Sequence, residues 1–135
     1  MSILLDTCAI FYVAEDRYIG KLSRTAVYEA ASHDALWVSL ASAWEIGKLA
    51  SQGRTAIAKN PLAFFKFFLT QTGAQICELN ADMMINSSFL PGRIHGDPMD
   101  RLLIESARHL NLTLLTSDRA ILAYGAEGHV KTLAC

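Results

Sequence analysis

The stretch "IHGDPMDRLLIESARHLNLTLLTSD" (residues 94–118) contains a helix followed by a strand. Asp97 precedes Pro98, a pair that is typical of a helix N-cap with proline at the first helical position. Apolar residues then recur at helical spacing, and the apolar run "LTLLT" (112–116) predicts a buried strand that ends before Asp118. A helix that leads directly into a buried strand indicates an α/β fold.

The rest of the chain repeats this alternation of apolar runs and helical patterns. We expect strands at 2–5, 35–42, 74–79, 112–116 and 129–134, and helices at 22–33, 43–52, 61–72, 80–90, 98–110 and 118–124. Strands that alternate with helices from end to end predict an α/β fold in three layers, in which helices flank a mostly parallel central sheet. Because no linker or repeat interrupts the pattern, we expect one domain over residues 1–135.

Composition restricts the class of protein. The chain is 52% hydrophobic, which is enough for a full core. No apolar run approaches the roughly 18 residues of a membrane span, and the N-terminal apolar run has no basic leader, so we expect neither a membrane segment nor a signal peptide. The three cysteines form no CxxC pair, which favours a reducing, cytoplasmic setting.

The charge balance is close to neutral. Twelve Lys+Arg face thirteen Asp+Glu, which gives a net charge of −1. A protein that holds nucleic acid by charge alone is strongly basic, so local basic residues or bound cations would have to supply any such attraction.

Each acid of interest has a structural explanation when it is taken alone. Asp97 fits an N-cap, and Asp100 falls in the first turn of the same helix, where a carboxylate suits the helix dipole and can reach back to the cap. Ser42 and Glu45 form the S-x-x-E pattern of a capping box. The same explanation covers the two acids that follow predicted strands, Asp6 and Asp118.

Taken together, these acids predict a site. In a parallel sheet, residues that follow strands or begin helices meet at the carboxyl edge, where a crevice forms at the reversal of strand order. Four carboxylates would meet there: Asp6, Glu45, Asp100 and Asp118. Such a cluster repels itself unless a cation lies among the acids.

The donor type indicates Mg²⁺ or Mn²⁺, because these hard cations prefer oxygen ligands. The four histidines have no ligand-like spacing, and we interpret His95 as a loop residue although it lies near Asp97. A cation held by carboxylates can activate water and stabilise the leaving oxygen of an in-line displacement, which is the chemistry of phosphodiester hydrolysis.

The sequence also resembles a known family, the PIN-domain nucleases, and in particular their bacterial VapC-like toxin branch. "ILLDT" (3–7) resembles the opening strand with its first metal-binding aspartate, and "VSLASAWEIGKL" (38–49) resembles the second motif. "HGDPMDRLLIESARHLNLTLLTSD" (95–118) resembles the run through the third and fourth acids. The resemblance covers nearly the whole chain, and the order and spacing of the motifs are more specific than any one of them.

The resemblance implies a metal-dependent ribonuclease whose acidic site consists of Asp6, Glu45, Asp100 and Asp118. Asp97 matches a second aspartate of the toxin motif, and we give it a capping or supporting role. Three hydroxyl residues would support the site: Thr7 would position Asp6, while Thr116 and Ser117 would hydrogen-bond within it. Lys48 and Arg101 lie close in sequence to the acids and are our candidates for contacts with RNA phosphates.

The resemblance also implies partners. Members of the family commonly form homodimers and are held inactive by a cognate antitoxin that fills the groove. The helix at 61–72 carries four phenylalanines (Phe64, Phe65, Phe67, Phe68), and we expect it to contribute to that contact.

Three alternatives compete with a toxin ribonuclease. A flavodoxin-like receiver domain normally has an acidic pair after its first strand and a late lysine followed by proline, whereas this chain has Asp6-Thr7 and Lys131-Thr132. A haloacid-dehalogenase-type phosphatase needs D-x-D after its first strand, and "DTC" lacks the second aspartate. The third alternative, a PIN-like domain that binds RNA or protein without cutting, stays open, although a complete set of acids favours cleavage.

Overall fold

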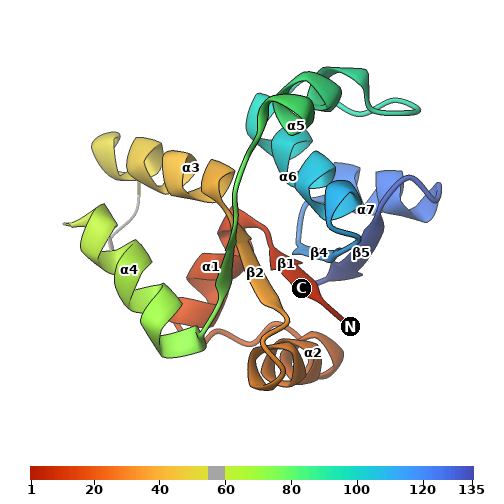
Figure 1. Ribbon diagram of the computed structural model, residues 1–135. Coiled ribbons are helices and arrows are strands. Elements are labelled where there is room, and N and C mark those ends of the chain that lie inside the picture. Colours follow the sequence, from red (N-terminus) through yellow and green to blue (C-terminus); the bar gives the residue numbers. More distant parts are fainter. Residues whose placement is uncertain (55–59) are drawn as a thin grey trace.

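The computed structural model describes residues 1–54 and 60–135, which form a parallel sheet with helices on both faces (Figure 1). The strands are β1 (Ile3–Leu5), β2 (Leu36–Ser39), β3 (Gln75–Cys77), β4 (Thr113–Thr116) and β5 (Lys131–Ala134). The helices are α1 (Thr7–Ala14), α2 (Lys21–Ser32), α3 (Leu40–Ser51), α4 (Pro61–Thr72), α5 (Ala81–Asn86), α6 (Pro98–His109) and α7 (Arg119–Ala126), with a 3₁₀ turn η1 (Ser87–Phe89). The prediction of a three-layer α/β fold is confirmed.

The sheet reverses its strand order beside β1. The order is β3-β2-β1-β4-β5, and all four pairings are parallel. After β1, the chain forms β2 and β3 on one side of it and then returns to place β4 on the other side. Ile3 of β1 therefore pairs with both Leu36 and Thr113. This order differs from the 2-1-3-4-5 order of flavodoxin-like receiver domains, which removes that alternative.

Successive residues of the central strands point to opposite faces and build two cores. Leu4 packs with residues of α6 and α7 such as Leu103 and Tyr124. Ile3 and Leu5, its neighbours on β1, pack against α1, α2, α3 and α4 on the other face. Because both faces of β1 are buried, its residues are all apolar, which is why the run of 2–5 showed no alternation.

The structure adds one helix to the prediction and moves the start of another. Helix α1 was not predicted, because "TCAIFYVA" is apolar on nearly all sides and shows no polar face. Helix α3 begins at Leu40, within the predicted strand 35–42, and the Oγ of Ser39 accepts a hydrogen bond from the N–H of Ala41 at 3.1 Å. The N-cap is therefore Ser39, and Ser42 is a buried residue inside the helix.

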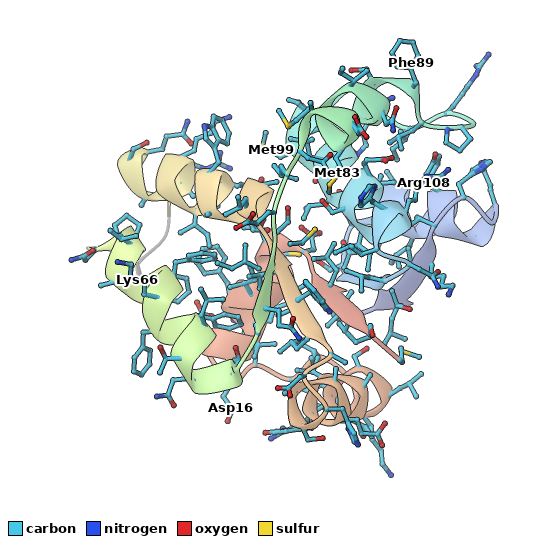
Figure 2. The ribbon with its side chains drawn as sticks, in the orientation of Figure 1. Asp16, Lys66, Met83, Phe89, Met99 and Arg108 are labelled. Carbon is cyan, nitrogen blue, oxygen red and sulfur yellow. The ribbon has the colours of Figure 1, made fainter. Side chains whose placement is uncertain are left out.

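In the segment between β3 and α6, α5 and η1 both pack against α6. In α5, Met83 is buried against the core, while Phe89 on η1 is 79% exposed and points into solvent (Figure 2). No helix within residues 1–54 and 60–135 is long and apolar enough to cross a membrane.

The two-sided core gives a direct stability test on α6. Leu103 is fully buried, so Leu103→Ala leaves a cavity and should lower the free energy of unfolding by about 2–5 kcal/mol. Leu110→Ala, at the exposed C-cap of the same helix, is the matched control and should cost under about 1 kcal/mol. Urea denaturation of both variants measures the difference, and equal losses would contradict this packing of α6.

Candidate active site

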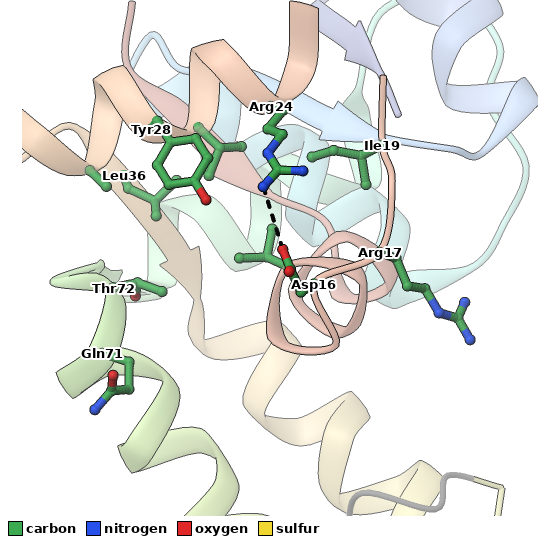
Figure 3. A pocket seen from close by; sticks show the side chains of 11 residues that line it. Asp16, Arg17, Ile19, Arg24, Tyr28, Leu36, Gln71 and Thr72 are labelled. Atoms are coloured by element: carbon green, nitrogen blue, oxygen red, sulfur yellow. Dashed lines mark ion pairs between the residues drawn. The ribbon is translucent and has the colours of Figure 1, made fainter. Parts of the chain in front are cut away.

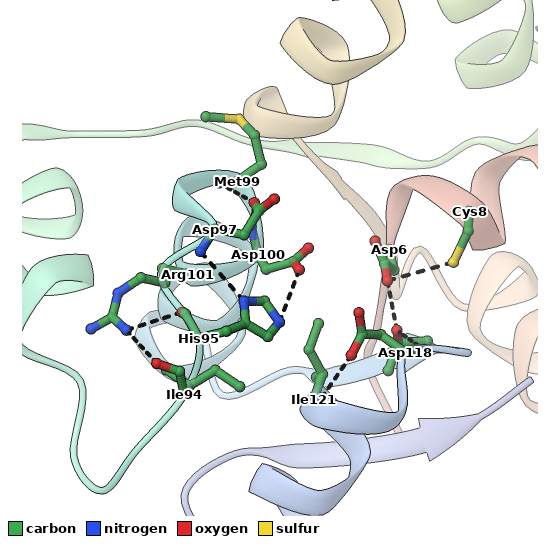
Figure 4. A network of polar contacts seen from close by, with 11 residues as sticks. Asp6, Cys8, Ile94, His95, Asp97, Met99, Asp100, Arg101, Asp118 and Ile121 are labelled. Atoms are coloured by element: carbon green, nitrogen blue, oxygen red, sulfur yellow. Dashed lines mark hydrogen bonds and ion pairs between the residues drawn. The ribbon is translucent and has the colours of Figure 1, made fainter. Parts of the chain in front are cut away.

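A cleft of about 380 Å³ opens at the carboxyl ends of β1 and β4, where the strand order reverses. Its lining contains all four predicted acids: Asp6, Glu45, Asp100 and Asp118. Asp97, Thr7 and Ser117 also line it, together with Phe11 and Leu49. The fold thus brings together residues that are more than one hundred positions apart in the sequence (Figure 4).

Asp6 lies directly after β1 and is only 6% exposed. Its Oδ1 accepts the backbone N–H of Thr7 at 2.6 Å, which caps α1. Its Oδ2 accepts the hydroxyl of Thr116 at 2.6 Å and the thiol of Cys8 at 3.5 Å. Both carboxylate oxygens are therefore held in place by the protein.

Thr116 connects the two central strands at this edge. It is fully buried at the end of β4, and while its hydroxyl donates to Asp6 it accepts the N–H of Asp118 at 3.0 Å. Asp118 in turn caps α7, where its Oδ1 accepts the N–H of Ile121 at 3.0 Å. The predicted hydrogen-bonding role of Thr116 therefore has a geometric basis, and Ser117 lies 3.4 Å from the Sγ of Cys8.

Asp97 and Asp100 begin α6. The Oδ1 of Asp97 accepts the N–H groups of Met99 and Asp100 at 2.9 and 3.0 Å, so Asp97 is the N-cap. Asp100 makes no return bond to the cap; its Oδ2 lies 3.3 Å from the Nε2 of His95 instead. The capping-box interpretation of Asp100 is wrong, and this carboxylate faces the cleft.

Glu45 reaches the cleft from α3. It is not part of a capping box, because Ser42 is buried in the helix and its Oγ accepts the hydroxyl of Thr7 at 3.0 Å. Thr7 thus links the start of α1 to α3 and holds these two elements of the site together. Glu45 remains half-buried beside Asp6 and Asp97.

His95 is a site residue that the sequence interpretation assigned to a loop. One ring nitrogen of His95, one carboxylate oxygen of Asp100 and one carboxylate oxygen of Asp118 all lie within 4.8 Å of one another. The signal in the sequence was its position, two residues before the cap Asp97, but nothing in the sequence shows that the ring turns back toward Asp100.

Burial, together with repulsion from neighbouring carboxylates, raises the pKa values of three acids in the cleft. Burial, followed by the charges of Asp6 and the other cleft carboxylates, raises the pKa of Asp100 to about 7. Burial is also the main cause that raises the pKa of Asp6, and it raises the pKa of Glu45. The ionised forms of these three carboxylates are therefore disfavoured in the cleft.

The two basic candidates differ in their surroundings. Lys48 is exposed one turn after Glu45 on α3, with its Nζ 5.3 Å from the centre of the Trp44 ring. Arg101 is engaged within the protein: its Nε and Nη1 donate to the carbonyls of Ser87, Ile94 and His95. These bonds fix the loop before α6, and a contact of Arg101 with RNA phosphate stays a prediction.

A second pocket, of about 250 Å³, lies among α1, α2 and α4 (Figure 3). Its polar side chains include Arg24, which lies 3.8 Å from Asp16 and stacks over the ring of Tyr28. Because its lining has a single carboxylate, this pocket does not offer the set of ligands that the acidic cleft offers.

Comparisons with known proteins agree with this architecture. A PIN domain family model matches residues 3–127. No curated protein matches the chain. The fold is similar to the structure of VapBC2 from Rickettsia felis bound to a DNA fragment from their promoter, with a TM-score of 0.72, 16% identity, and coverage of 99% of this chain and 98% of that one.

Two other solved structures are also similar. VapBC-1 from nontypeable Haemophilus influenzae has a TM-score of 0.62 at 16% identity and covers 99% of this chain and 98% of that one. A domain of a functionally unknown protein from Methanocaldococcus jannaschii has a TM-score of 0.57 at 15% identity, covering 99% and 90%. At such identities these structures establish the fold alone. Since the family model spans all four acids of the cleft, the chain belongs to the PIN domain family.

Proposed function

We propose that this protein is a metal-dependent endoribonuclease and the toxin of a toxin–antitoxin pair. The observation that carries the proposal is the convergence of four carboxylates in one cleft at the reversal of strand order: Asp6, Glu45, Asp100 and Asp118. Membership of the PIN domain family supports nuclease chemistry at that cleft.

The donors in the cleft fit a divalent cation. They are carboxylate oxygens, which Mg²⁺ and Mn²⁺ prefer. Burial, followed by the charges of the neighbouring carboxylates, raises the pKa of Asp100 to about 7, so its ionised form is disfavoured, and a cation would stabilise that form. Asp100 and Asp118 offer oxygens close enough to share one ion, and Asp6 and Glu45 line the same cleft.

We assign separate roles to the residues in and beside the cleft. A divalent cation, when bound, supplies the positive charge that polarises a phosphate oxygen and makes water more acidic. Asp6 is fixed for its part by Thr116 and the N–H of Thr7, so its carboxylate does not reorganise when a cation or substrate arrives. Lys48, one turn from Glu45, is placed to meet a neighbouring phosphate of the RNA.

The antitoxin contact is proposed at the groove between α1 and α4. This groove, of about 570 Å³, is lined by Val13, Phe64 and Phe67, among others, and Phe67 is 64% exposed. Phe64 stacks on Phe11 with ring centres 5.5 Å apart, and Phe11 lines the acidic cleft. The groove and the acidic cleft are therefore neighbours, separated by the stacked rings of Phe64 and Phe11.

The four phenylalanines of α4 do not all serve that contact. Phe65 and Phe68 are 8% and 3% exposed and belong to the core. The structures of VapBC2 and VapBC-1 support the choice of a VapB-like antitoxin as the partner. We also expect a homodimer that works in the cytoplasm, which light scattering and fractionation would test.

A PIN-like domain that binds RNA or protein without cutting is the competing function. It predicts the same fold and binding surfaces but no cleavage under any metal condition. The cleavage experiment below separates the two.

The raised pKa of Asp100 predicts how stability depends on pH in the metal-free protein. The carboxyl of Asp100 releases its proton near pH 3.8 in the unfolded chain and near pH 7 in the folded chain. The stability that protonated Asp100 contributes is therefore complete below pH 3.8 and is lost as pH rises through about 7. Asp100→Asn removes this loss, and at pH 8 the variant should be more stable than the parent by on the order of 1–2 kcal/mol. Thermal melts in EDTA at pH 4 and pH 8 measure this; an equal difference at both pH values would contradict it.

Cleavage is tested with a mixed RNA pool. The parent should cut with Mg²⁺ or Mn²⁺ and not with EDTA, while Asp6→Asn and Asp100→Asn should be slower by roughly 100-fold or more, because each removes a charge from the site. Asp82→Asn, the same change at an exposed first-turn acid of α5, is the matched control and should cut like the parent. Folded, antitoxin-free parent protein that cuts under none of these conditions would favour the non-cutting domain.

The groove is tested with the product of a neighbouring small open reading frame as the antitoxin. Phe67→Asp should weaken that complex by roughly 30-fold or more, because it places a charge where an apolar contact forms, and it should leave cleavage intact. Phe89→Asp, at an exposed aromatic residue on η1, is the control and should bind like the parent. Titration of the purified proteins by calorimetry measures both, and equal affinities for the two variants would place the contact elsewhere.

A further inference from the structure

Three contacts connect His95, Asp97 and Asp100 in a closed network (Figure 4). The backbone N–H of Asp97 donates to the Nδ1 of His95 at 3.4 Å. The N–H of Asp100 donates to the Oδ1 of Asp97 at 3.0 Å. The Nε2 of His95 lies 3.3 Å from the Oδ2 of Asp100, which closes the network.

This network of contacts determines which nitrogen of the neutral imidazole carries the proton. A backbone N–H can only donate, so Nδ1 must be the acceptor and Nε2 must carry the hydrogen. That hydrogen faces the Oδ2 of Asp100. Turning the imidazole by a half-rotation about its bond to Cβ would replace both nitrogens by carbon and would lose both contacts.

The backbone of His95 is anchored from a second direction. The Nη1 of Arg101 donates to the carbonyls of Ile94 and His95 at 3.1 and 3.4 Å, and its Nε donates to the carbonyl of Ser87 at 2.8 Å. Arg101 follows Asp100 in α6, so the helix that carries the carboxylate also holds the loop that carries the imidazole. The distance between the two groups is thereby fixed.

We infer that His95 is a positioning residue for Asp100: its Nε2–H donates to the Oδ2 of Asp100 and sets the orientation of that carboxylate beside Asp118, while His95 itself does not bind the cation. The inference rests on the proposed function, because it assigns Asp100 and Asp118 to a metal ion. Carboxylates that bind metal ions are held in turn by hydrogen bonds of this kind, and the lone pair that a nitrogen ligand would need is occupied by the proton on Nε2.

The tautomer can be measured without any variant. Long-range ¹H–¹⁵N correlation spectra of the full chain at neutral pH distinguish the two neutral forms of each histidine. We expect His95 in the Nε2–H form, identified by the signals that disappear in His95→Gln. A proton on Nδ1 would overturn the inference, because Nε2 would then have no hydrogen to donate.

Mn²⁺ affinity measures what the bond contributes. His95→Leu removes the donor and should weaken Mn²⁺ binding by roughly 10- to 100-fold, as measured from the EPR signal of the free ion. His95→Gln keeps an N–H donor of similar reach and should recover most of the affinity. His109→Leu, at an exposed histidine in the last turn of α6, is the control and should bind like the parent.

The remaining outcomes separate this inference from the proposed function. Unchanged affinity in His95→Leu, beside lost affinity in Asp100→Asn, would overturn the inference alone, as would a His95→Gln variant no better than His95→Leu. Pulsed EPR of the bound Mn²⁺ should show no directly coordinated nitrogen in the parent, and such a signal, lost in His95→Leu, would make His95 a ligand instead. If the parent binds no Mn²⁺, the proposed metal site and this inference fail together.

Discussion

The hydroxyl of Thr116 connects the two strands on which the candidate site is built. It donates to Asp6 at the end of β1 and accepts the N–H of Asp118 after β4, both at hydrogen-bond distance in a fully buried position. This arrangement requires β1 and β4 to be neighbours, which follows only from the reversal of strand order. Because α1 begins at Asp6 and α7 begins at Asp118, the same contact also sets where these two helices start.

Capping and site formation are compatible in this fold. Asp6, Asp97 and Asp118 each accept backbone N–H groups at the start of a helix, so the N-terminal ends of α1, α6 and α7 all face the cleft. The partial positive charge of these helix ends offsets part of the repulsion among the acids. Asp100 and Glu45 cap nothing, and the pKa of each is raised, mainly by burial. Asp6 combines both features, because its pKa is also raised, mainly by burial, although it caps α1.

The sequence predicted what depends on local pattern. Alternating apolar runs and helical stretches predicted all five strands and the parallel sheet, and the order of Asp6, Glu45, Asp100 and Asp118 predicted which acids would meet. The prediction missed α1, whose residues are apolar on nearly all sides because it packs between the sheet and α3. The start of α3 was misplaced because Ser39 and Ser42 are equally good caps by type; in the structure Ser39 caps the helix, and Ser42 lies inside it and accepts the hydroxyl of Thr7.

Contacts between distant segments were beyond local pattern. Arg101 follows Asp100 in sequence, but nothing local predicts that its guanidinium donates to the carbonyl of Ser87, which lies fourteen residues earlier and comes close only through the turn of the chain. His95 looked like a loop residue because nothing in the sequence gives the direction of its ring. The strand order itself also required the structure, since alternation predicts a parallel sheet without saying on which side of β1 the chain returns.

The claim that the cleft is a metal site is tested most directly by anomalous diffraction from antitoxin-free crystals soaked in Mn²⁺. The structure predicts an anomalous peak in the cleft, at bonding distance from carboxylate oxygens of Asp100 and Asp118 and bordered by Asp6. Mn²⁺ peaks only at surface carboxylates such as Asp82, with the cleft clear of anomalous density, would contradict a metal site there and leave Asp6 and Asp118 as helix caps alone.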